Sequence, residues 1–198
     1  NPKWICGYSD ITVLHNKIHS TGLASIHSTM PINFANNTPA ALTTMSNALF
    51  GKKYTLRSPS STFNKPGECQ GQSIGGNLSI ICSLSGTDLD LNTKGKILFL
   101  EDLDEYLYHI DRMMNNLKRS GKLQNLAGLV IGGMTDMKDN KISFGKKAYQ
   151  IIQEATSEYA YPVCYDFPFG HVNDNRAIVL GKNYSLIVTS KGGVLQHK

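Results

Sequence analysis

The sequence predicts an α/β protein, with a parallel α/β pattern in its first part and a mixed α/β, β-rich second part. Short apolar runs alternate with amphipathic helical patterns, as they do where strands are joined through helices. Three of the apolar runs end in polar residues, at Ser9, Glu101 and His171. Reacting groups collect at the carboxyl ends of strands in such folds, so these three residues are the candidate site. With 198 residues, 40% of them hydrophobic, the chain is long enough to bury a core.

The first part of the chain alternates strand and helix. The elements expected there are a strand over residues 3–8, a helix over 10–21, a strand over 23–27 and a helix over 39–50. We expect the first helix to bury Ile11, Leu14 and Ile18, and to end at Gly22. The second helix begins with Thr38 as a capping hydroxyl followed by Pro39.

After Gly51 the composition changes, and we expect a domain boundary near this residue. A half-exposed strand at residues 54–56 and a loop over Ser58–Gly71 come first. Beyond the loop we expect helices at 78–86, 106–120 and 144–159 and strands at 97–100, 126–131 and 163–167. Two or three β segments follow over 176–194. The helix over 106–120 has the clearest amphipathic pattern.

Composition excludes several classes of function. The net charge of +5 comes from scattered basic residues without interleaved aromatics, so we expect no nucleic-acid partner. No apolar run reaches the length of a membrane span, and we expect no membrane partner. The four cysteines form no Cys-x-x-Cys pair and have no histidine at zinc spacing, so we expect no metal. Gly132-Gly133 lacks a dinucleotide-binding pattern, and we expect no cofactor.

Each candidate residue also has a structural interpretation. Ser9 lies between an apolar strand and a helix, where it suits a nucleophile but also a helix cap. Glu101 and Asp102 are adjacent, so on a strand only one of them can face a shared site. His171 follows an apolar segment hinged at Gly170, and a histidine in such a place is often structural.

One further pair of histidines has helical spacing. His15 and His19 lie four residues apart, as two metal ligands on one helix face would. No third ligand with suitable spacing is visible, so we expect both side chains at the surface.

Taken together, several segments resemble one family of serine carboxypeptidases. The chain is similar, in order, to the murein LD-carboxypeptidases (muramoyl-tetrapeptide carboxypeptidases) and the microcin C self-immunity peptidases. The likeness lies in Lys3–Thr12, His27–Pro31, Gly75–Leu78, Ile97–Asp102, Ile110–Met113, Leu126–Gly132, Pro168–His171 and Leu180–Gly181.

The resemblance implies roles for particular residues. It places the family's catalytic serine on Ser9, its glutamate on Glu101 and its histidine on His171, with the backbone N–H of Asp10 as one oxyanion donor. The family has a flavodoxin-like N-terminal domain, which holds the serine. A C-terminal swivelling β/β/α domain supplies the glutamate and the histidine. We therefore expect residues 1–50 to be a remnant of the first domain and residues 51–198 to be the second.

The implied activity is hydrolysis of the amide bond to a C-terminal D-alanine of a murein tetrapeptide, in the cytoplasm, during cell-wall recycling. Most of the N-terminal domain, including a Gly-rich turn that supplies the second oxyanion donor, lies outside this sequence. The chain also departs from many relatives in carrying Ser28-Thr29 where they have Gly-Pro. On its own we expect it to be nearly inactive.

Two other functions remain open from the sequence. A microcin-immunity peptidase would cleave an aminoacyl-nucleotide amide and would need an aromatic stacking platform. We expect the only tryptophan, Trp4, on a core strand, which disfavours that function. A non-catalytic peptide-binding domain is the second alternative. The apolar first strand leaves a sheet edge to pair with another chain, so we also expect a homodimer.

Overall fold

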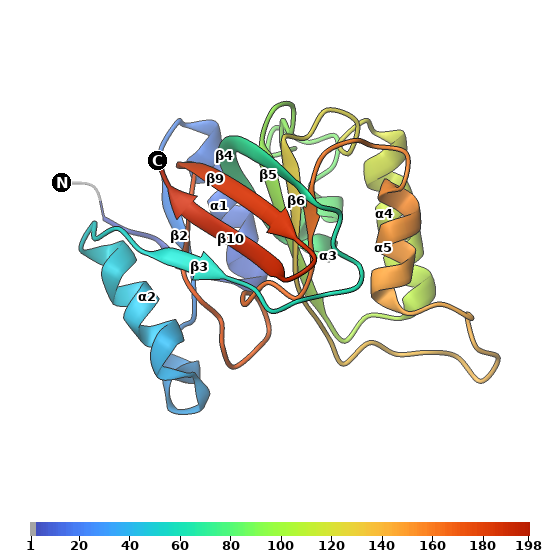
Figure 1. Cartoon of the computed structure of the whole chain (residues 1–198), viewed down its shortest axis with the longest axis horizontal. Coiled ribbons are helices and arrows are strands. Elements are labelled where there is room, and N and C mark those ends of the chain that lie inside the picture. The colour runs from blue at the N-terminus through green and yellow to red at the C-terminus, as the bar shows by residue number, and fades with distance from the viewer. Residues whose placement is uncertain (1–2) are drawn as a thin grey trace.

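The computed structural model describes residues 3–198, which form two sheets that share their core with flanking helices (Figure 1). The smaller sheet has three strands in the order β1-β2-β8. Strand β1 (Cys6–Gly7) is parallel to β2 (Ser25–His27), and β8 (Ile178–Leu180) is antiparallel to β2. A strand from near the C-terminus therefore completes the sheet that the first residues begin.

The larger sheet has seven strands in the order β3-β10-β9-β4-β5-β6-β7. Strands β4 to β7 are parallel to one another, whereas β3, β10, β9 and the first half of β4 pair antiparallel. Their bounds are β3 Thr55–Arg57, β4 Gly67–Asn77, β5 Ile97–Leu103, β6 Gly128–Thr135, β7 Val163–Cys164, β9 Asn183–Thr189 and β10 Gly192–His197. The predicted α/β class is confirmed, and the larger sheet is mixed, as expected for the second part of the chain.

Among residues 3–198, five α-helices flank the sheets. Helices α3, α4 and α5 share one hydrophobic cluster with β5 and β6, and Figure 1 shows α4 and α5 side by side. Helices α1 and α2 contact the strands of the smaller sheet. The helices are α1 Thr12–Ser20, α2 Pro39–Leu49, α3 Leu78–Ser83, α4 Leu107–Arg119 and α5 Ala148–Thr156, with 3-10 turns η1 Ser9–Ile11 and η2 Pro31–Asn36.

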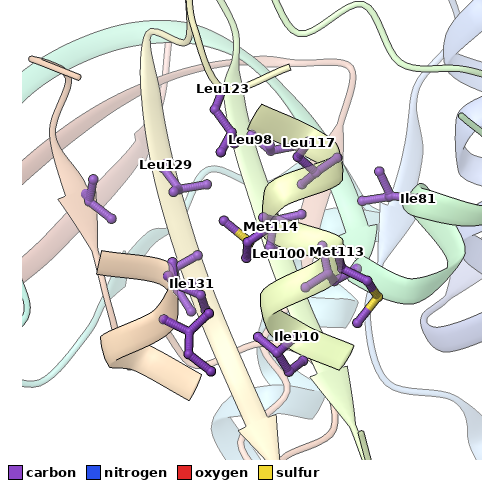
Figure 2. Close-up of a cluster of buried hydrophobic side chains, with 14 of the residues drawn as sticks. Ile81, Leu98, Leu100, Ile110, Met113, Met114, Leu117, Leu123, Leu129 and Ile131 are labelled. Atoms are coloured by element: carbon purple, nitrogen blue, oxygen red, sulfur yellow. The ribbon is translucent and has the colours of Figure 1, made fainter. Parts of the chain in front are cut away.

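The main core lies between α4 and the strands β5 and β6 (Figure 2). The buried stripe of α4 recurs every three or four residues, as the amphipathic pattern predicts. It consists of Leu107, Ile110, Met113, Met114 and Leu117. Replacing one of these buried residues by alanine typically lowers the free energy of unfolding by about 2–5 kcal/mol.

Strand β5 buries both of its faces, and this decides where its two carboxylates point. Leu98 and Leu100 pack on the helices, whereas Ile97 and Phe99 pack on the opposite side in a second cluster. Side chains alternate along a strand, so Glu101 continues the second face and Asp102 the helical face. The two carboxylates therefore lie on opposite faces of β5 and have different partners, as the alternation predicts.

The loop expected over Ser58–Gly71 is wrong at its C-terminal end. Strand β4 begins at Gly67, pairs first with β9 and then with β5, and ends at Asn77. Its glycines are required by close packing: a Cβ at Gly75 would lie 2.0 Å from the Phe99 carbonyl oxygen. A strand rich in glycine and polar residues resembles a loop in sequence, and only its neighbours reveal its role.

The buried face expected for the first helix is also wrong. Helix α1 buries Thr12, His15 and Asn16, while Leu14 is 46% exposed. His15, expected at the surface, is 1% exposed, and His19 is partly buried. Trp4, expected in the core, is 41% exposed on the stretch that leads into β1. Sequence hydrophobicity therefore misassigns this region.

Two later elements are shorter than expected. The helix predicted over 144–159 occupies Ala148–Thr156, and the strand predicted over 163–167 is Val163–Cys164. The three β segments β8, β9 and β10 confirm the pattern expected over 176–194. The domain boundary near residue 50 stays a prediction.

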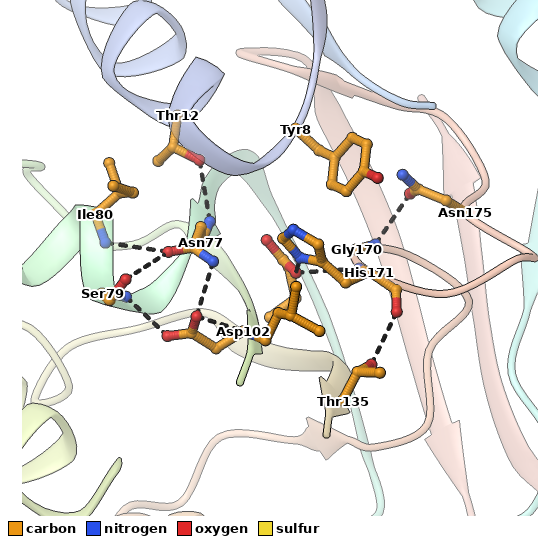
Figure 3. A network of polar contacts seen from close by, with 12 residues as sticks. Tyr8, Thr12, Asn77, Ser79, Ile80, Asp102, Thr135, Gly170, His171 and Asn175 are labelled. Carbon is orange, nitrogen blue, oxygen red and sulfur yellow. Dashed lines mark hydrogen bonds and ion pairs between the residues drawn. The ribbon is translucent and has the colours of Figure 1, made fainter. Parts of the chain in front are cut away.

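A buried polar network holds Asp102 on the helical side of β5 (Figure 3). Its Oδ1 accepts hydrogen bonds from Asn77 Nδ2 and the Leu103 backbone N–H, both at 2.9 Å, and its Oδ2 accepts from Ser79 N–H at 3.0 Å. Asn77 also caps α3 by accepting from the N–H of Ile80. Burial raises the pKa of Asp102 to about 6, although its three hydrogen bonds act in the other direction. The carboxyl thus binds a proton more tightly in the folded state.

This pKa gives the stability a measurable pH dependence. The folded-state pKa lies above the ordinary aspartate value of 3.8, so the contribution to stability is fully present below pH 3.8 and is lost as the pH rises through about 6. Between pH 5 and pH 7 the loss amounts to about 1 kcal/mol. We expect Asp102→Asn to remove this component, as measured by urea unfolding at both pH values.

The exposed Asp104, which pairs with Lys138, provides the control. Asp104→Asn should keep the pH dependence of the native chain. Identical pH dependence in the native chain and in Asp102→Asn would contradict the assignment.

Candidate active site

The geometric centre of the site is a contact between Glu101 and His171. Glu101 Oε2 lies 2.6 Å from His171 Nδ1 and accepts a second hydrogen bond, of 3.2 Å, from the His171 backbone N–H. The Glu101 side chain is fully buried, and that of His171 is 14% exposed. The sequence-predicted glutamate and histidine, 70 residues apart, are therefore brought together by the fold.

Glycines allow the loop that carries His171 to reach Glu101. Strands β5 and β6 shift register between Leu100 and Asp102, so that Gly132 and Gly133 lie opposite Glu101. The loop packs directly on this bulge, where the Gly133 N–H donates to the Phe169 carbonyl at 3.1 Å. A Cβ at Gly132 would lie 2.5 Å from Phe169, which excludes any larger side chain there.

Gly170 makes the last part of this approach possible. Its φ of +94° lies in the left-handed region, and a Cβ here would lie 2.6 Å from the Glu101 side chain. The Asn175 side chain fixes the turn by accepting a hydrogen bond of 2.9 Å from the Gly170 N–H. Asn175 is buried, and nothing in the sequence pattern pointed to it.

Ser9 occupies a strained turn between β1 and α1. Its φ of +61° is unusual for a residue with a Cβ and is typical of sites where the surroundings impose a conformation. The helix-cap interpretation finds no support, because Tyr8 and Ile11 are the N-cap residues of η1 and α1 and neither cap is made by a side chain. The hydroxyl is thus not used as a cap.

The neighbours of Ser9 bring its turn next to His171. Figure 3 shows the ring of Tyr8 next to the imidazole of His171. The two rings meet edge-on, with 4.7 Å between their centroids. The Tyr8 hydroxyl donates to Asn33 Oδ1 at 3.2 Å. Within residues 3–198, Ser9 Oγ makes no direct hydrogen bond to His171. Tyr8 is a site residue that its position beside Ser9 could have suggested.

The surroundings favour a charged His171. Burial alone would lower its pKa, but the hydrogen bond to Glu101 and the negative charges of Glu101, Asp102 and Asp10 together raise the pKa above its ordinary value. Because Nδ1 contacts the Glu101 carboxylate, Nε2 is the nitrogen available to a reacting group. This arrangement suits a general base whose protonated form is stabilised by a carboxylate.

The described part of the chain contains neither a metal-binding cluster nor a membrane-spanning helix. No cluster of three or more histidine, cysteine, aspartate or glutamate side chains among residues 3–198 is arranged to hold a metal ion. No helix among the same residues has the length and apolar character needed to cross a membrane.

Comparison with known proteins places this chain in a family. The model of the LD-carboxypeptidase C-terminal domain matches residues 70–186, and that of the LD-carboxypeptidase N-terminal domain matches residues 1–28. The probable murein peptide carboxypeptidase of Bacillus subtilis (strain 168) is 32% identical over 202 aligned residues. That alignment covers 99% of this chain and 63% of the relative, so the chain spans less than two thirds of the relative's length.

Solved structures show the same fold. The muramoyltetrapeptide carboxypeptidase from Oxalobacter formigenes superposes with a TM-score of 0.89 at 24% identity, covering 98% of this chain and 68% of that one. An MccF-like protein from Bacillus anthracis str. Ames superposes with a TM-score of 0.79 at 26% identity, covering 100% of this chain and 68% of that one. From the matched domains and the identity to the Bacillus subtilis protein, we conclude that this chain belongs to the LD-carboxypeptidase family.

Proposed function

We propose that this chain forms part of a serine carboxypeptidase that hydrolyses the amide bond to a C-terminal D-alanine of a murein tetrapeptide. The observation that supports it most is the buried Glu101–His171 contact beside the Ser9 turn. Relatives named as murein peptide carboxypeptidases agree with this substrate class. A role in cell-wall recycling in the cytoplasm, and a homodimeric state, belong to the same proposal.

In the proposed reaction, His171 Nε2 removes the proton from Ser9 Oγ while the oxygen attacks the carbonyl carbon before the D-alanine. The resulting oxyanion accepts a hydrogen bond from the Asp10 backbone N–H. The imidazolium then gives its proton to the leaving nitrogen, which releases D-alanine and leaves an acyl group on Ser9.

Hydrolysis of the acyl group repeats the same proton transfers with water. His171 removes a proton from the water as it attacks the ester, and returns the proton to Ser9 Oγ as the ester bond breaks. Throughout, Glu101 holds Nδ1 protonated and stabilises the imidazolium, because its Oε2 accepts from both Nδ1 and the backbone N–H. Hydrogen bonds between such groups often tighten only when the substrate is bound, so the geometry of the free site is compatible with this mechanism.

The microcin-immunity function ranks second. It is favoured by the superposition with the MccF-like protein, but it needs an aromatic platform for a nucleotide base. Trp4 is exposed, yet it precedes β1, whereas Ser9 follows the carboxyl end of that strand. Trp4 and Ser9 are thus attached at opposite ends of β1, which disfavours Trp4 as a stacking platform for the site. A non-catalytic peptide-binding domain is the remaining alternative.

We predict that Ser9→Ala and His171→Ala each lower kcat by at least about 10³-fold in the complete protein. The double variant should be little slower than either single variant, because the two groups act in one step. Release of D-alanine from a murein tetrapeptide measures the rate, and covalent labelling by a fluorophosphonate probe locates the nucleophile.

His109→Ala serves as the control and should retain full activity, because the partly exposed His109 imidazole pairs with Glu105 and not with Glu101 or His171. Additive losses in the double variant would show that the two residues act independently. Labelling at a residue other than Ser9 would remove the proposed nucleophile, and a protein that binds the peptide without labelling would favour the binding-domain alternative.

A second prediction concerns pH. Because the carboxylates raise the pKa of His171, the acidic limb of kcat/KM should lie above the ordinary histidine value of about 6.5. Glu101→Gln keeps the shape but removes the charge, so burial then dominates and the limb should move to lower pH, while kcat falls. Rates measured from pH 5 to pH 9 test this shift.

Asp104→Asn is the matched control, because it removes a carboxylate near the end of the same strand that does not act on His171. An acidic limb that stays in place in Glu101→Gln would mean that His171 is not the titrating base.

A further inference from the structure

Helix α1 buries polar side chains instead of apolar ones. Thr12, His15 and Asn16 lie on one face at helical spacing and are each at most 3% exposed. Each makes a hydrogen bond outside its own helix: Thr12 Oγ1 accepts from Asn77 N–H at 3.0 Å, and Asn16 Nδ2 donates to the Leu89 carbonyl at 3.3 Å. Buried polar groups are costly unless paired, so this face contributes specific positioning rather than apolar burial.

His15 is the member of this face that contacts the strand leading to Ser9. Its Nε2 lies 3.0 Å from the Gly7 carbonyl oxygen, and its Nδ1 lies 2.8 Å from Ser25 Oγ. A carbonyl can only accept, so Nε2 carries the proton and Nδ1 accepts from the serine hydroxyl. Burial lowers the pKa of His15, which keeps the ring neutral and preserves this arrangement.

The Gly7 carbonyl is thereby held by two donors. The Ser28 backbone N–H donates to it from β2's end at 3.1 Å, and His15 donates from α1. Two residues later the chain enters the left-handed turn at Ser9. Such a conformation costs about 1–3 kcal/mol and persists only where its surroundings determine the backbone on several sides.

We propose that His15 is a positioning residue that fixes the Ser9 turn by donating Nε2–H to the Gly7 carbonyl, with Ser25 selecting the required tautomer. The inference rests on the proposed function, because it assigns His15 to the nucleophile of that reaction. His15 touches no reacting atom. It acts by holding the peptide that precedes the turn.

The alternative use of His15 as a metal ligand does not fit these contacts. Both of its ring nitrogens are already engaged, and His19 instead contacts Lys96 Nζ through Nε2 at 2.8 Å. The nearest imidazole is that of His27, with 6.1 Å between ring centroids; it is fully buried and its pKa is lowered to about 3, by burial first. It therefore remains neutral and places no charge beside His15.

The test compares His15→Leu with His15→Gln in the complete protein. Leucine fills the space without a donor, whereas glutamine retains an N–H near the position of Nε2. We expect His15→Leu to slow fluorophosphonate labelling of Ser9 and to lower kcat by about 10–100-fold with little change in KM, because small misplacements of a nucleophile have effects of this size. His15→Gln should recover part of the rate. His19→Gln, one helical turn away, is the matched control and should label at the native rate.

A spectroscopic measurement on the native chain keeps the inference testable if His15→Leu does not fold. Nitrogen-15 NMR should show His15 neutral and protonated at Nε2 near pH 7, and Ser25→Ala should reduce the population of that tautomer and slow labelling. The opposite tautomer in the native chain, or native labelling rates in a folded His15→Leu, would overturn the inference. Absence of labelling in the native complete protein would instead contradict the proposed function, while the tautomer measurement would still decide the hydrogen bond.

Discussion

The buried carboxylate of Glu101 is the constraint on which the rest of the site depends. A charge without solvent contact must be paired, since leaving it uncompensated costs several kcal/mol. Here one oxygen, Oε2, accepts both the imidazole N–H and the backbone N–H of His171, so the ring and its peptide are fixed together. Its second oxygen, Oε1, has no hydrogen-bond partner among residues 3–198. His171 therefore donates both of the hydrogen bonds that this carboxylate accepts within those residues.

His171 can approach Glu101 this closely only because several positions along the path are glycine. The bulge at Gly132 and Gly133 lets the Phe169 backbone pack directly on β6, and Gly170 lets the chain turn over the Glu101 side chain. Each glycine costs conformational entropy on folding, but any larger residue would separate the histidine from the carboxylate. Phe167 and Phe169, in the segment that leads to His171, pack in the same apolar cluster as Phe99.

Helix α1, which follows the Ser9 turn, is held by polar contacts of its buried face rather than by apolar packing. Thr12 fastens α1 to the end of β4, and the same strand end is fastened through Asn77 to Asp102 on β5. Helix α1 and the strand that carries Glu101 are thus linked through shared hydrogen bonds. A displacement of either element would leave buried polar groups unpaired, so α1 and β5 have a defined relative position.

The sequence by itself determined the α/β class and the stripe of α4, because these follow from local periodicity. It proposed the three candidate residues from their places after strands. It also indicated that Glu101 and Asp102 diverge, since alternation is a local property of strands. Only the tertiary structure decided that β4 is a strand and that His15 is buried, because glycine-rich and polar segments derive their place from their partners. The meeting of Glu101 with His171 depended likewise on close backbone approach, which hydrophobic periodicity does not encode.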